Sequence, residues 1–92
     1  MALLSKNELQ YNYSWKEYNN EDPKVSGELD NTIFNRSEGY EMLYLLNKIA
    51  AMQNITNKTI CLRMEIMIID SLPGEICSQI DVRNWIRDNW NK

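Results

Sequence analysis

The apolar pattern of the chain is strongest in residues 60–72, which read ICLRMEIMIIDSL. On a helix of 3.6 residues per turn, Thr59, Arg63 and Asp70 form one polar stripe, and apolar side chains occupy most of the remaining circumference. A helix with two apolar faces must be covered on both of them. We therefore expect one face to pack in the core of the chain and the other to meet a partner surface.

Two further helices are predicted on either side of this one. Residues 35–53 carry an amphipathic pattern in which Asn35 is the expected N-cap and Glu38 favours the first turn. Residues 78–91 begin with Ser78 and Asp81 in the spacing of a capping box, and their apolar residues share one face. The short link between the first two helices predicts an antiparallel hairpin.

The residues before the first helix have a different pattern. Aromatic and polar residues alternate from Tyr11 to Trp15, and a polar stretch with Pro23 and Gly27 follows. We expect an extended aromatic arm, or alternatively a short β-hairpin around residues 23–27. The predicted fold is mainly α: a single domain over 1–92, with arm and loop in 1–34 and a three-helix core in 35–92.

Composition sets limits on this picture. The chain has 92 residues, 43% of them hydrophobic, which is enough for a packed core. The net charge is −3, and residues 1–42 hold four basic and eight acidic side chains against six and five in residues 43–92. No stretch has the length of a membrane span and the first residues do not form a secretory signal, so we expect a cytoplasmic protein. Cys61 and Cys77 are then expected as free, buried thiols.

The sequence offers little catalytic chemistry. The chain contains no histidine, so the usual activation of a thiol or hydroxyl by imidazole is excluded. Glu65 lies within an apolar arc. It could act as a general acid or base in a dry pocket. We favour the alternative, in which its carboxylate reaches the edge of an interface or pairs with a basic side chain. We expect no enzyme, no cofactor and no metal site, because two thiols without histidine do not form a typical zinc site.

The excess of apolar surface predicts a self-associating interaction protein, with a dimer favoured and another protein partner as an alternative. The aromatic side chains of the arm are expected to pack over the first helix or to cross to a second subunit, rather than to stack nucleobases. The candidate interface residues are Trp15, Tyr40, Tyr44, Met64, Met67, Ile68 and Ile69.

Two alternatives belong to other functional classes. The helix over residues 79–91 carries Arg83 and Arg87, with Lys92 just beyond, so it is a candidate nucleic-acid-binding element. The methionines of the helical core are adaptable enough to line a small-molecule pocket. These methionines are Met42, Met52, Met64 and Met67.

Several segments resemble small uncharacterised proteins carried by phages, plasmids and integron gene cassettes. The similarity lies in residues 35–41 (NRSEGYE), Leu45, residues 47–48 (NK) and residues 85–90 (WIRDNW). The resemblance implies an accessory protein of mobile DNA, and it transfers no functional residue to this chain.

Overall fold

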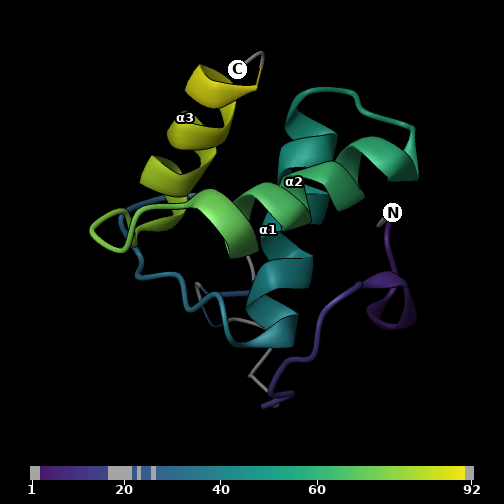
Figure 1. Cartoon of the computed structure of the whole chain (residues 1–92), viewed down its shortest axis with the longest axis horizontal. Helices are drawn as coiled ribbons and strands as arrows, with labels where there is room; N and C mark the ends of the chain where they lie inside the picture. Colours follow the sequence, from purple (N-terminus) through teal and green to yellow (C-terminus); the bar gives the residue numbers. More distant parts are fainter. Residues whose placement is uncertain (1–2, 17–21, 23, 26, 91–92) are drawn as a thin grey trace.

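The fold is mainly α, as predicted. The computed structural model describes residues 3–16, 22, 24–25 and 27–90. A short 3-10 helix, η1 (Lys6–Glu8), is followed by α1 (Gly39–Met52), α2 (Lys58–Ser71) and α3 (Gln79–Asn89). Figure 1 shows α3 and the N-terminal segment on opposite sides of the α1–α2 pair. α1 and α2 are packed neighbours, although α2 crosses α1 in this view instead of running beside it.

Local capping explains where α2 and α3 begin. The Asn57 side chain accepts a hydrogen bond from the backbone N–H of Thr59 (2.8 Å), which caps α2. Ser78 accepts one from Asp81 N–H (3.3 Å), and the predicted start of α3 is confirmed.

The predicted start of α1 at Asn35 is wrong. The side chain of Asn35 accepts a hydrogen bond from Ser37 N–H (2.9 Å) and so closes a local turn ahead of the helix. The backbone of Glu38 is extended and pairs with Ser14 in an isolated bridge, which delays the helix until Gly39. The start of α1 therefore depends on pairing with a segment that is distant in the sequence.

One apolar face of α2 is buried within the single chain, and the second face, which holds Leu62, Ile66 and Ile69, is covered in part. Cys61, Glu65 and Ile68 are buried, and hydrophobic residues of the N-terminal segment join the same core. The exposed stripe is the predicted polar one, and Ile66, which is 40% exposed, lies within it. The covering residues precede the helix by some 50 positions, so local periodicity did not reveal them.

The N-terminal segment is held to α1 by side-chain contacts. The amide of Asn47 accepts from Leu4 N–H (2.7 Å) and donates to Leu4 C=O (3.1 Å). The ring of Trp15 packs edge-on against Tyr40, with 4.9 Å between ring centroids. Packing of the arm on α1 thus occurs at Tyr40, whereas the proposed hairpin around residues 23–27 includes positions outside the described residues.

Backbone hydrogen bonds join residues 30–34 to the start of α3 and to the residue before its N-cap. Phe34 N–H donates to Cys77 C=O (2.6 Å), and the N–H groups of Gln79 and Ile80 donate to Thr32 C=O and Asp30 C=O. These carbonyls satisfy helix donors that have no partner within the helix. Cys77, in the link before α3, is exposed rather than buried, whereas the adjacent Ser78 is buried.

We expect the packing of the Trp15 ring against the start of α1 to require glycine at position 39. A Cβ atom at residue 39 would lie 2.6 Å from three ring carbons of Trp15, much closer than van der Waals contact. We expect Gly39→Ala to lower the free energy of unfolding by about 1 kcal/mol in urea titrations, because overpacking outweighs the gain in helix propensity. Gly74→Ala is the matched control, since a Cβ there meets nothing within 4 Å. Equal stability of the two variants would contradict this packing.

Candidate functional site

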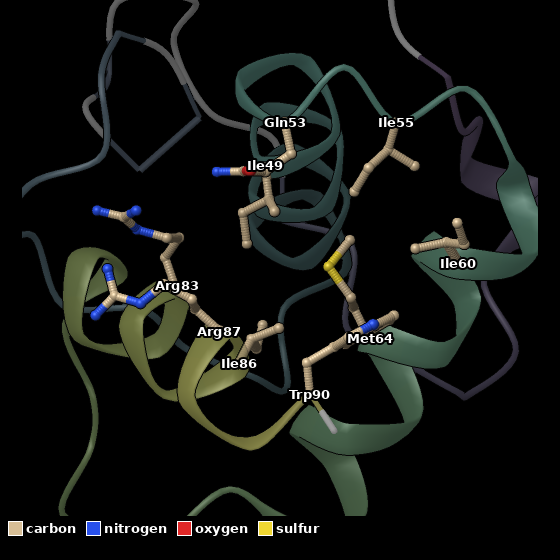
Figure 2. A pocket seen from close by; sticks show the side chains of 9 residues that line it. All are labelled: Ile49, Gln53, Ile55, Ile60, Met64, Arg83, Ile86, Arg87 and Trp90. Atoms are coloured by element: carbon tan, nitrogen blue, oxygen red, sulfur yellow. The ribbon is translucent and has the colours of Figure 1, made fainter. Parts of the chain in front are cut away.

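The described part of the chain forms an apolar groove between the end of α1, the start of α2 and α3. Its cavity volume is about 370 Å³. The lining consists largely of aliphatic side chains and one indole, together with two arginines and a glutamine (Figure 2). The lining residues are Ile49, Gln53, Ile55, Ile60, Met64, Arg83, Ile86, Arg87 and Trp90.

The turn after α1 contributes two residues to the lining of the groove. Asn54 adopts a left-handed conformation with a φ of 57°, which asparagine tolerates better than most residues. Ile55 N–H then donates to Ala50 C=O (2.8 Å), which folds the link back on the helix end. Ile55 and Gln53 are consequently placed at the groove, opposite the residues of α3.

Two arginines mark one end of the groove. Arg83 and Arg87 are one turn apart on α3, and Figure 2 shows their guanidinium groups next to each other. Arg83 is half-buried, and its Nε is a buried donor without a hydrogen-bond partner in the described part of the chain. The Arg87 side chain is 61% exposed, and its Nε donates to Asp88 (3.2 Å). The groove therefore has an apolar body and a cationic end.

A third arginine fixes the indole wall. The guanidinium of Arg63 on α2 stacks on the ring of Trp90, 4.5 Å from its centroid. An Nη atom of Arg63 also donates to Trp90 C=O (3.2 Å). A cation stacked on tryptophan is held by the negative face of the ring, so these contacts tie the end of α3 to α2.

The predicted interface residues lie in different parts of the structure. Met64 and Ile68 are 2% and 0% exposed, so they belong to the core of the single chain and are not available to a partner. Tyr40 packs on Trp15, and the Tyr44 hydroxyl donates to Gly27 C=O. Met67 and Ile69 are half-buried against the core. The candidate set is not one continuous surface.

The groove does not match the predicted methionine-rich pocket, which stays a prediction. Met64 alone of the four methionines lines the groove. Met42 is fully buried in the core, and Met52 is exposed at the end of α1. Isoleucines supply most of the apolar lining instead. Of the nucleic-acid candidates, Arg83 and Arg87 lie at the groove, while Lys92 falls outside the described residues.

Glu65 is fully buried and is bound by the N-terminal segment. Its carboxylate accepts hydrogen bonds from the backbone N–H of Gln10 (3.0 Å to each oxygen), from the Gln10 amide (3.2 Å) and from the Tyr13 hydroxyl (2.5 Å). Burial, reinforced by the bond to Glu65, raises the pKa of Tyr13 above its ordinary value. The expected basic partner is thus replaced by neutral donors, and Glu65 fastens the arm to α2.

Other reactive groups are separated from the groove. Burial raises the pKa of the Cys61 thiol, which favours the neutral, unreactive form. Among the described residues, no group of three or more His, Cys, Asp or Glu side chains is arranged to hold a metal ion. Within the same residues, no helix is long and apolar enough to cross a bilayer.

Comparison with known proteins gives no family assignment. No family model, curated protein or solved structure matches the chain. The resemblance to proteins of mobile DNA therefore stays a prediction, and the geometry of the groove carries the functional argument.

Proposed function

We propose that the chain is a non-catalytic binding protein whose groove receives the apolar part of a small ligand. The observation that carries this proposal is the cavity of about 370 Å³ between the three helices. A concave, mostly apolar site of this size with a few convergent polar groups is typical of small-molecule sites. Three different elements contribute to its walls, so the site depends on the folded chain.

The lining supports binding rather than catalysis. Its titratable groups are Arg83 and Arg87, which remain protonated in proteins. Neither serves as a nucleophile or general base at neutral pH, and the lining holds no carboxylate, thiol or hydroxyl. A ligand in this groove would be held and oriented, without a group to attack it.

Self-association and nucleic-acid binding stay predictions, and the geometry favours the groove over both. A dimer would have to use a surface other than Met64 and Ile68, which are buried in the single chain. A nucleic-acid contact through α3 would rely on Arg87, because the Arg83 side chain is half-buried at the groove.

Methyl NMR of the isoleucines and methionines tests the proposal with eight-carbon amphiphiles such as octanoate. We expect saturable shifts of the methyl groups of Ile49, Met64 and Ile86, which line the groove. Ile33 and Ile66 are exposed elsewhere and report non-specific adsorption. Their signals should stay in place. Shifts at Ile33 and Ile66 alone, or no shift with any eight-carbon probe, would refute the proposal.

A pair of variants sharpens this test. Ile55→Trp enlarges a half-buried lining side chain and is expected to weaken octanoate binding at least tenfold by filling the groove. Ile33→Trp adds the same bulk at an exposed site outside the lining and should leave binding unchanged. Thermal melts of both variants establish that they are folded before binding is compared.

A further inference from the structure

We propose that the ligand is an aliphatic carboxylate whose head group binds Arg83 and Arg87 while its chain lies along the apolar groove. This inference rests on the proposed function and specifies the ligand class. The two guanidinium groups lie together at one end of the groove, and the wall formed by Ile60 and Trp90 lies toward the other (Figure 2). The site is thus polarised along its length.

The hydrogen-bonding state of Arg83 points to an acceptor from outside the chain. A buried donor without a partner is unfavourable, and native structures satisfy nearly all such groups. Arg83 Nε is such a donor in the described part of the chain. A carboxylate at the arginine end would supply the acceptor once the Arg83 side chain turns its Nε toward the groove, and it would also replace the solvent lost from the half-buried guanidinium.

The spacing of the two arginines supports the same conclusion. Like charges four residues apart on a helix repel each other. Arg83 and Arg87 have this spacing, and the acidic contact recorded for the pair is that of Asp88 with Arg87 Nε. A bound anion would relieve this repulsion.

The shape of the site favours a carboxylate on an aliphatic chain over other anions. Guanidinium groups match planar carboxylates, which they bind through paired hydrogen bonds. The remaining lining is mainly isoleucine side chains, which offer no hydrogen bonds to a sugar or a second charged group. A single anionic head with an unbranched apolar tail therefore uses both parts of the groove.

Octanoate, 1-octanol and octyltrimethylammonium separate charge from apolar length. We expect octanoate to bind the wild-type groove at least tenfold more tightly than 1-octanol at low salt. Octyltrimethylammonium is expected to bind more weakly than both. Added salt should reduce the preference for octanoate, because screening weakens contacts with the exposed Arg87. Equal affinity of octanoate and 1-octanol would overturn the carboxylate assignment while leaving the apolar groove as a binding site.

Arginine variants locate the head group. Arg83→Gln and Arg87→Gln should each reduce octanoate affinity several-fold and reduce 1-octanol affinity much less, so the preference for octanoate should shrink. Lys6→Gln removes the same charge from the N-terminal segment, where Lys6 contacts Trp15 and Tyr40 at the opposite end of α1 from the groove. It should preserve the preference. Persistence of the full preference in both arginine variants would also overturn the assignment, and failure of every probe to bind would instead refute the proposed function.

Discussion

Replacing Glu65 with glutamine is expected to lower the free energy of unfolding by about 3 kcal/mol, the largest effect of a polar substitution predicted for this chain. The carboxylate is fully buried and accepts hydrogen bonds at both oxygens from Gln10 and Tyr13. Glutamine has nearly the same volume but one acceptor oxygen, and its amide NH₂ would face the donors of the N-terminal segment. Urea unfolding followed by circular dichroism measures the change.

Two further variants isolate the contribution of this buried contact. Glu75→Gln makes the same chemical change at an exposed position in the α2–α3 link and should alter stability by less than about 0.5 kcal/mol. Tyr13→Phe removes one donor to Glu65 and is expected to cost about 1.5 kcal/mol, so it remains measurable even if Glu65→Gln does not fold. Additive effects of Tyr13→Phe and Glu65→Gln in a double-mutant cycle would show that the contact does not couple the two residues.

Glu65 also shows which part of the fold the sequence could predict. The helical period placed it in an apolar arc of the helix, and that placement is confirmed by its burial. Its partners could not be found in the same way, because Tyr13 is 52 residues away along the chain. A local pattern reports which face is buried, whereas the identity of the covering segment depends on tertiary packing.

The helix boundaries show the same contrast between local sequence signals and tertiary packing. Ser78 and Asn57 cap their helices through neighbours two or three residues ahead, so local sequence carries the whole signal. Asn35 has an equally suitable side chain, but the pairing of Glu38 with Ser14 keeps the backbone extended there. The start of α1 therefore depends on a contact with Ser14, which is too distant in the sequence to appear in the local pattern around Asn35.

The groove was only partly predictable. The spacing of Arg83 and Arg87 is visible in the sequence, and it was interpreted as a candidate nucleic-acid contact. Arg83 and Arg87 share the groove with Ile55 and Ile60 because of the way α3 packs against the α1–α2 pair. The periodicity of the sequence does not specify this packing. Two arginines beside isoleucines brought from other helices favour an amphiphile over a nucleic acid.

The Arg36→Ala variant is expected to lose about 2 kcal/mol of stability, because Arg36 binds the C-terminus of α2. Its guanidinium donates to Ile68 C=O (3.2 Å), Leu72 C=O (2.8 Å) and Pro73 C=O (3.2 Å). The last carbonyls of a helix have no partners within it, and the helix dipole places partial negative charge there. Since Pro73 follows directly and has no N–H to donate, the side chain of Arg36 supplies the missing donors.

Lysine at this position separates charge from geometry. Arg36→Lys keeps the positive charge near the helix end but cannot reproduce the planar fork that reaches three carbonyls, so we expect it to recover about half of the loss. Arg87→Ala removes the same charge from an exposed side chain at the end of α3 and should change stability by less than about 0.5 kcal/mol. If Arg36→Lys were as stable as the wild type, charge alone would account for the effect. If Arg36→Ala were no less stable than Arg87→Ala, the bridge to α2 would contribute nothing, and the end of this helix would have to be stabilised by water.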